Sequence, residues 1–148
     1  MKVASTIKLM RLHQYVKNLF IFLPIFFAMK ITDIGLLSNA FIAFIAFSLI
    51  ASAIYTFNDY HDIEEDRKHP KKKDRPLASG VISKSQAIIV MSVLFLSGFI
   101  LMALLSFKAT GVLAVYVVMN IAYSFSLKQI SIVDVNIIAI GFILRLFI

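Results

Sequence analysis

The sequence predicts an all-α membrane protein, a polytopic bundle of about five transmembrane helices. Hydrophobic residues make up 60% of its 148 residues, against roughly 45–50% in a typical soluble domain, and the mean hydropathy is +0.90. The charged residues are confined to short gaps between long apolar runs. A chain of this length cannot bury so much apolar surface in one small core, so the lipid bilayer is the expected solvent.

Four apolar runs approach or exceed the roughly 20 residues that a helix needs to cross the hydrocarbon core. They are residues 35–57, 85–107, 109–127 and 130–148. The first three contain no charged residue, and the fourth contains only Asp134 and Arg145. Each run is therefore expected to form one span.

The first span, near residues 7–29, is the least regular. Its uncharged part covers only residues 18–29, so its helix is expected to begin earlier, near Ile7. Pro24 falls inside this helix and should kink it, because proline removes a backbone hydrogen bond. A cleaved signal peptide is the alternative reading of this basic, apolar start, but no small-x-small cleavage site follows Phe27.

Basic residues are distributed unevenly between the two sides that five spans create. Twelve lie before the first span, between the second and third, or between the fourth and fifth, and the other side has only Lys30 and Lys108. Cytoplasmic loops carry such an excess. The N-terminus, the loop 58–84 and the turn at Lys128 are therefore expected to face the cytoplasm, in a multi-pass protein of the inner cell membrane.

Net charge and cysteine content narrow the function classes. The net charge of +7 suits contact with anionic lipid headgroups or anionic substrates. Nucleic-acid binding is the other reading of a high pI, and it is not expected because the charges lie in short gaps between apolar runs. The chain has no cysteine, which excludes disulfides and thiolate metal sites.

The loop 58–84 holds six of the eight acidic residues. Asp59, Asp62 and Asp66 are spaced i, i+3, i+7, so on a helix they fall within roughly a 60° arc. Carboxylates on one face repel one another unless a cation lies among them, and oxygen-only ligands favour Mg²⁺. Asn58 adds a carbonyl or an amide donor. The alternative is a solvated loop that only signals topology, but such a loop has no need of this spacing.

A basic run follows the carboxylates, interrupted by Pro70 and Pro76. It comprises Arg67, Lys68, Lys71, Lys72, Lys73 and Arg75. A basic loop after a carboxylate face suits a diphosphate, because Mg²⁺ bridges two of its oxygens and Arg or Lys side chains bind the others.

Two motifs carry a resemblance to a known family. N-D-x-x-D-x-x-x-D at Asn58–Asp66, followed by R-P-L-A-S-G at Arg75–Gly80, resembles the UbiA superfamily of intramembrane prenyltransferases. In that family the Asp-rich motif ends the second helix and binds a Mg²⁺-diphosphate. The resemblance implies that this chain is the N-terminal half of a UbiA-type bundle. The family's second Asp-rich motif is absent, so the chain is expected to be a fragment or a truncated product, with the missing C-terminal half as a partner.

Four further segments are similar to one branch, the decaprenyl-phosphate phosphoribosyltransferases. They are R-L-H-Q-Y-V-K-N at Arg11–Asn18, D-R-K-H-P-K-K-K-D-R-P at Asp66–Pro76, Y-S-F-S-L-K at Tyr123–Lys128 and D-V-N-I-I-A-I-G-F-I-L-R at Asp134–Arg145. Leu12 and Tyr15 stand where that branch more often has Pro and Trp. Its enzymes move a 5-phosphoribosyl group from phosphoribosyl diphosphate onto a polyprenyl phosphate.

The resemblance implies a role for each candidate residue. Asp59, Asp62 and Asp66 would hold Mg²⁺ on the donor diphosphate and so serve as the catalytic set. Arg75, with Lys72 or Lys73, would neutralise the leaving charge. The candidates for holding the anionic substrates near the membrane face are Lys17, Asn18, Asn58, Tyr123, Lys128 and Arg145.

Arg145 lies inside an apolar run, where a charge is expensive and usually functional. The alternatives for this residue are pairing with Asp134 or snorkelling to the membrane interface.

Three classes of function stay open at this point. The first is a phosphoribosyl transferase whose partners are the lipid bilayer, a diphosphate donor and an isoprenoid lipid phosphate. The second is a prenyltransferase that moves an isoprenoid from its diphosphate to an aromatic acceptor. The third is not an enzyme but a divalent-cation transporter or membrane scaffold that uses the carboxylates as an ion site.

Overall fold

The computed structural model describes residues 3–127 and 131–148, with side chains described outside residues 126–135. Every regular element in this part of the chain is helical, which confirms the predicted all-α class. Three helices in the described residues are long and apolar enough to cross a membrane: Ile34–His61, Lys84–Leu105 and Phe107–Phe125. The architecture is that of a helical membrane bundle.

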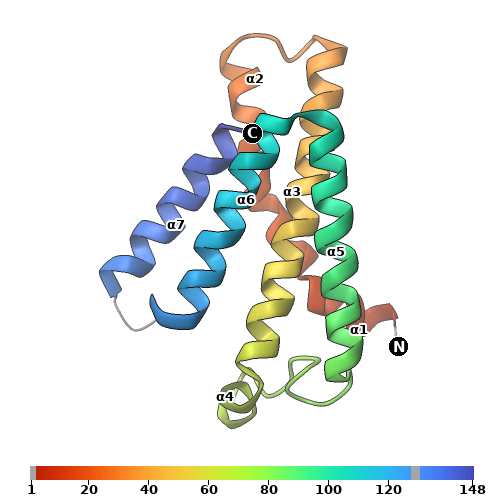
Figure 1. Ribbon diagram of the computed structural model, residues 1–148, viewed down its shortest axis with the longest axis vertical. Coiled ribbons are helices and arrows are strands. Elements are labelled where there is room, and N and C mark those ends of the chain that lie inside the picture. Colours follow the sequence, from red (N-terminus) through yellow and green to blue (C-terminus); the bar gives the residue numbers. More distant parts are fainter. Residues whose placement is uncertain (1–2, 128–130) are drawn as a thin grey trace.

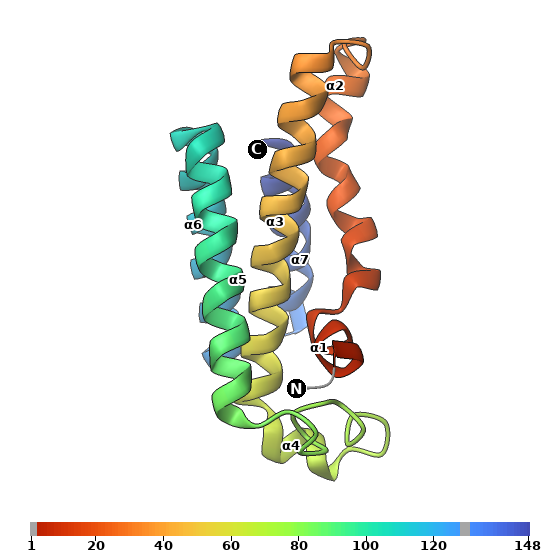
Figure 2. The same cartoon turned by 90° about the vertical axis from the view of Figure 1, so that its right-hand side faces the viewer.

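The long helices pack side by side along the long axis of the molecule (Figures 1 and 2). Helix α3 (Ile34–His61) lies against α5 (Lys84–Leu105), and α5 turns at Ser106 into α6 (Phe107–Ala122). A π-helical turn, η2 (Tyr123–Leu127), extends α6, and α7 (Ser131–Leu146) returns beside it. Helix α7 corresponds to the fifth predicted span but has only 16 residues, fewer than the roughly 20 of a full crossing.

The two ends of the bundle differ. Helix α1 (Val3–Met10), α4 (Ile63–Lys68) and the loop after α4 lie toward one end, whereas α2 (Leu23–Phe27) and the C-terminus lie toward the other (Figures 1 and 2). Helix α1 and the loop 58–84, which the basic residues predict to share one side of the membrane, therefore do share one end of the molecule. Polar side chains that lie far apart in sequence meet at this end.

The predicted first span is divided into three pieces, α1 (Val3–Met10), the 3₁₀ helix η1 (Leu12–Phe22) and α2. The expectation of one helix kinked at Pro24 was wrong. Pro24 lies in the first turn of α2, where its missing N–H is not needed. The chain bends instead at Arg11, whose φ of 54° is left-handed. Such a conformation persists where the surroundings fix it, and here the Arg11 side chain is paired with Asp59 on α3.

Capping side chains set where the spans begin. Asp33 accepts a hydrogen bond from the backbone N–H of Leu36 at the start of α3, and Ser83 forms a capping box with Gln86 at the start of α5. These groups satisfy backbone donors that a helix terminus leaves unpaired. Helix α3 also runs four residues beyond the predicted span, to His61. It therefore carries Asn58 and Asp59 on the same rigid helix as the buried core.

Helices α3 and α5 approach closely at Gly98. A Cβ added there would lie 2.7 Å from Cγ1 of Ile50 and 2.9 Å from the backbone oxygen of Ala46. A small residue at this crossing lets two backbones come together, as is common between membrane helices. The close contact fixes α3 laterally and with it the polar end of the molecule.

We expect Gly98→Ala to destabilise the bundle relative to Gly111→Ala by about 1–3 kcal/mol, the usual cost of overpacking. Gly111 is the matched control, because a Cβ there meets nothing within 4 Å while the gain in helix propensity is the same. Thermal unfolding of both variants in detergent measures the difference. Equal shifts in melting temperature would show that α3 and α5 are not closely packed at Gly98.

Candidate functional site

Two buried carboxylates share one guanidinium group at the loop end of the bundle. Asp59, near the end of α3, and Asp66, in α4, are each only 2% exposed. Arg75 Nη1 donates to Asp59 Oδ1 at 3.1 Å and to Asp66 Oδ2 at 2.7 Å. Arg11 forms a second ion pair with Asp59, and Lys72 Nζ lies 3.9 Å from Asp66 Oδ1. We call these five residues the carboxylate cluster.

The local fold explains why the two aspartates meet. Helix α3 ends at His61 and α4 begins at Ile63, but backbone bonds from Asp62 N to Asn58 O (3.0 Å) and from Asp66 N to Asp62 O (2.8 Å) continue the helical path. The predicted i, i+7 spacing therefore holds Asp59 and Asp66 on one face.

The loop after α4 then brings Arg75 back over that face. Arg67 Nε donates to the Ala78 carbonyl oxygen at 3.1 Å, and Leu77 and Ile82 are buried at 2% and 1% exposure. These contacts anchor the segment that follows Arg75, and the hydrogen bonds to Asp59 and Asp66 hold its guanidinium between the carboxylates.

Asp62 lies apart from the other two aspartates. Its Oδ1 is 3.1 Å from His61 Nδ1, and its side chain is 19% exposed. Within residues 3–127 and 131–148, no three Asp, Glu or His side chains are grouped so that they could hold a metal ion. The structure thus gathers two of the three predicted ligands around Arg75, because a guanidinium already supplies the positive charge that adjacent carboxylates require.

The chemistry of the cluster fits a hard divalent cation. Asp59 and Asp66 offer only oxygen ligands, and both carboxylates are buried. One oxygen of each accepts a hydrogen bond from the same nitrogen, Arg75 Nη1, so the two carboxylates lie close together. Mg²⁺ is bound by a few carboxylates together with substrate phosphates. Asp59 and Asp66 are the residues of this cluster that would hold such an ion.

A polar cavity of about 260 Å³ opens next to the cluster, between η1, α3, α6 and α7. Four of the predicted substrate-binding residues line it: Lys17, Asn58, Tyr123 and Arg145. Tyr55, Tyr116 and Asn120 also line it. Cluster and cavity share one turn of α3, since Tyr55 lines the cavity while its ring lies 5.1 Å from the Arg11 guanidinium. The carboxylate cluster and the polar cavity therefore adjoin at this turn of α3.

Arg145 is buried at 6% exposure in the wall of this cavity. Its Nε donates to Asn18 Oδ1 at 3.0 Å, and its Nη1 donates to the Gly141 carbonyl oxygen. The guanidinium carbon lies 4.7 Å from the ring centroid of Phe47 and 5.1 Å from that of Phe142. Ring faces and neutral acceptors thus stabilise a cation inside an apolar helix. The side chain of Asp134, its predicted alternative partner, lies outside the described residues.

Asn58 lines the polar cavity, whereas Asn18 does not. Asn18 is 2% exposed and lies behind the cavity wall, bonded to Arg145 and Ser48. Asn58 lines the cavity, and its Oδ1 contacts the Ser124 hydroxyl, which ties α3 to the end of α6. Lys128, the remaining candidate, lies outside the described residues.

Sequence reasoning missed Arg11, Tyr55, Tyr116 and Asn120. Arg11 stands in the R-L-H-Q-Y-V-K-N segment and was counted only as a topology signal. The available clue to Arg11 was that it is a cation at the start of a span, on the membrane side predicted to carry the loop with three aspartates. The two tyrosines and Asn120 lie inside apolar runs that give no sign of which face borders a cavity.

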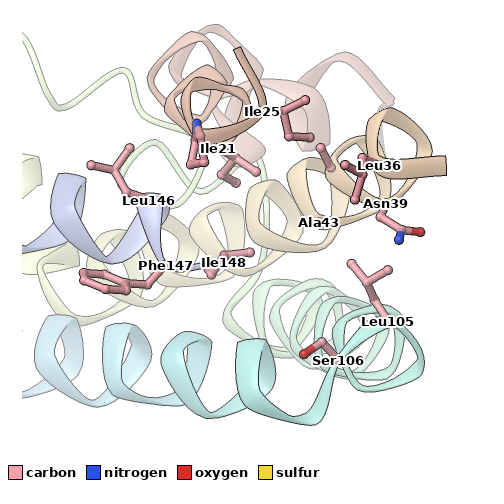
Figure 3. Close-up of a pocket in the computed structure, with 12 residues that line it drawn as sticks. Ile21, Ile25, Leu36, Asn39, Ala43, Leu105, Ser106, Leu146, Phe147 and Ile148 are labelled. Atoms are coloured by element: carbon pink, nitrogen blue, oxygen red, sulfur yellow. The ribbon is translucent and has the colours of Figure 1, made fainter. Parts of the chain in front are cut away.

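A second cavity, of about 360 Å³, lies at the opposite end of the bundle. Its labelled lining in Figure 3 is almost entirely apolar, with Asn39 and Ser106 as the polar side chains. No charged side chain is among its lining residues. Although it is the larger cavity, it offers nothing to bind a diphosphate and lies away from the carboxylate cluster.

Comparison with known proteins gives the family. The sequence profile described as the UbiA prenyltransferase family matches residues 19–148. The chain is 36% identical to the uncharacterized protein y4nM of Sinorhizobium fredii, over 93% of this chain and 27% of that protein. It is 34% identical to the decaprenyl-phosphate phosphoribosyltransferase of Mycobacterium tuberculosis, over 97% of this chain and 49% of that enzyme.

A more distant similarity is to the 4-hydroxybenzoate octaprenyltransferase of Blochmanniella pennsylvanica, with 28% identity over 87% of this chain and 45% of that enzyme. The chain spans about half the length or less of these curated relatives. The profile covers most of the chain, including every residue of the carboxylate cluster except Arg11 and every lining residue of the polar cavity except Lys17. This chain therefore belongs to the UbiA prenyltransferase family of membrane transferases.

Proposed function

We propose that this chain binds the donor and the acceptor of a transferase that moves a 5-phosphoribosyl group from phosphoribosyl diphosphate to a polyprenyl phosphate. The observation that carries the proposal is the pair of adjacent cationic sites, the carboxylate cluster and the polar cavity. A reaction between two phosphorylated substrates needs two such sites. The 34% identity to an enzyme named for this reaction supports the same reading.

The donor diphosphate binds at the carboxylate cluster. Asp59 and Asp66, with Asp62 as the third ligand that the sequence predicts, would hold Mg²⁺, and that ion would supply positive charge to the departing diphosphate. Arg75 and Lys72 supply cations to the remaining diphosphate oxygens. Arg11 adds a third cation on the side of the polar cavity.

The acceptor phosphate binds in the polar cavity, with Lys17 and Arg145 as its cationic partners and Asn58 and Tyr123 as hydrogen-bonding groups. Two anions repel each other in solution, so holding them against fixed cations removes a large part of the barrier. An acceptor phosphate oxygen attacks the anomeric carbon of the ribose as the bond from that carbon to diphosphate breaks. The carbon carries oxocarbenium character during this exchange.

The membrane setting follows from the distribution of charge. The cluster includes residues of α4 and of the loop 58–84, which lie toward the same end of the bundle as α1 (Figure 1). The positive-inside bias orients this end toward the cytoplasm, and the inner membrane places the cluster where a soluble phosphorylated donor and a lipid acceptor meet.

A prenyltransferase that acts on an aromatic acceptor is the second candidate. In that case the prenyl diphosphate takes the cluster, and the rings of Tyr55, Tyr116 and Phe142 around the polar cavity suit an aromatic acceptor. The relative from Blochmanniella carries such a name. The third class, a cation transporter or scaffold, finds no support in the family membership.

Equilibrium binding to the purified chain in detergent with Mg²⁺ separates the two transferases. We expect phosphoribosyl diphosphate to bind at least about tenfold more tightly than geranyl diphosphate, a difference of about 1.4 kcal/mol. Inorganic diphosphate is the control, because it competes for the cluster in either case. Tighter binding of geranyl diphosphate would overturn the phosphoribosyl proposal in favour of the prenyl one.

A further inference from the structure

A chain of buried hydrogen bonds joins three elements behind the polar cavity. Asn18 Nδ2, in η1, donates to Ser48 Oγ in α3 at 2.9 Å, and Arg145 Nε, in α7, donates to Asn18 Oδ1 at 3.0 Å. Ser48, Asn18 and Arg145 are 0%, 2% and 6% exposed. Burying a polar group costs free energy unless it forms hydrogen bonds. A chain of buried hydrogen bonds inside an apolar bundle therefore points to a role beyond packing.

The bonds fix the direction of each group. Because Ser48 accepts from the amide nitrogen of Asn18, the amide oxygen is turned toward Arg145. Arg145 then uses Nε on Asn18 and Nη1 on the Gly141 carbonyl oxygen. The rings of Phe47 and Phe142 lie on the guanidinium at 4.7 and 5.1 Å. The plane of the guanidinium is thereby held at one orientation in the cavity wall.

Asn18 itself does not line the cavity, whereas Arg145 does. Asn18 therefore acts on a ligand only through Arg145. A guanidinium already held in place loses less freedom on binding an anion than a mobile one does.

We infer that Asn18 is a positioning residue that presents the Arg145 guanidinium to the phosphate group of a lipid in the polar cavity, with Ser48 setting the orientation of Asn18. The inference rests on the proposed function for the nature of the ligand. The new claim is that Arg145 depends on Asn18 for the orientation of its guanidinium.

The test is a double-mutant cycle on binding of farnesyl phosphate to the whole 148-residue chain in detergent. We expect Asn18→Leu to weaken binding about tenfold, in line with the loss of one hydrogen bond to a charged group. Arg145→Leu should weaken it more, and the double variant no further than Arg145→Leu alone, because coupled residues are not additive. Asn39→Leu, in the wall of the other cavity, is the matched control and should leave binding unchanged.

Farnesol separates positioning from a structural role. It lacks the phosphate, so Asn18→Leu should leave its binding unchanged, whereas a disturbed cavity would weaken both ligands. Ser48→Ala provides a milder variant that keeps Asn18 in place. It should weaken farnesyl phosphate binding about threefold and have no effect in the Asn18→Leu background.

Additive losses for Asn18 and Arg145, or equal losses for farnesyl phosphate and farnesol, would overturn the inference and leave the proposed function standing. If Arg145→Leu itself leaves farnesyl phosphate binding unchanged, the acceptor site of the proposed function fails, and the role of Asn18 fails with it.

Discussion

Replacing Arg75 with leucine is expected to destabilise the protein by about 3 kcal/mol, near the lower end of the cost of removing one partner from a buried ion pair. Arg75 is the shared partner of Asp59 and Asp66, whose side chains are both 2% exposed. Without it, Lys72 Nζ at 3.9 Å is the one cation left paired with Asp66 among the described residues. We expect a loss of stability near the lower end of that range because Arg11 still pairs with Asp59.

Thermal or denaturant unfolding in detergent measures this loss, and two variants control it. Lys72→Leu also removes a cation facing Asp66, but that cation is 45% exposed, and such pairs contribute at most about 1 kcal/mol. In an Asp59→Asn/Asp66→Asn background, Arg75→Leu should cost much less, since no buried negative charge is left behind. A large loss in that background would show that Arg75 stabilises the loop by packing rather than by charge.

The sequence predicted the parts of the fold that depend on local patterns. Uncharged runs located α3, α5 and α6, which are the three helices among the described residues long and apolar enough to span a membrane. The i, i+7 spacing placed Asp59 and Asp66 on one face, and the structure brings both to Arg75. These features follow from helical periodicity alone.

Features that depend on contacts distant in sequence could not be predicted in this way. The bend at Arg11 depends on the contact of its side chain with Asp59, 48 residues away, so no nearby residue signals it. Pro24 is a local signal for a kink, and it predicted the bend at the wrong place. Asn18, one of the predicted substrate-binding candidates, pairs with Arg145, 127 residues away. Only the return of α7 beside η1 creates that pair.

Asp62 shows the limit of spacing as a guide to a metal site. On one straight helix Asp62 would share a face with Asp59 and Asp66. In the structure Asp62 is the residue between α3 and α4. Its carboxylate contacts His61. Whether the three aspartates hold one ion together stays a prediction, and the carboxylate cluster is the place to test it.

The double substitution Asp59→Asn/Asp66→Asn is expected to weaken Mg²⁺-dependent binding of phosphoribosyl diphosphate by about a hundredfold or more, since even outer-shell partners of a metal site contribute about 10–100-fold to affinity. The matched control is Glu64→Gln/Glu65→Gln. It also removes two negative charges, from the helix α4 that carries Asp66, but both side chains are exposed, and it should leave that binding unchanged.

The sign of the effect makes this measurement decisive. If the basic residues alone held the donor, removing two carboxylates would leave more net positive charge beside Arg11 and Arg75, and the anion would bind more tightly. The most direct test of the account is therefore isothermal titration of phosphoribosyl diphosphate into wild type and the Asp59→Asn/Asp66→Asn variant, with Mg²⁺ and with a chelator. We predict that the variant binds more weakly than wild type with Mg²⁺ and at least as tightly with the chelator. Tighter or unchanged binding by the variant in the presence of Mg²⁺ would contradict the assignment of these aspartates to a metal-diphosphate site.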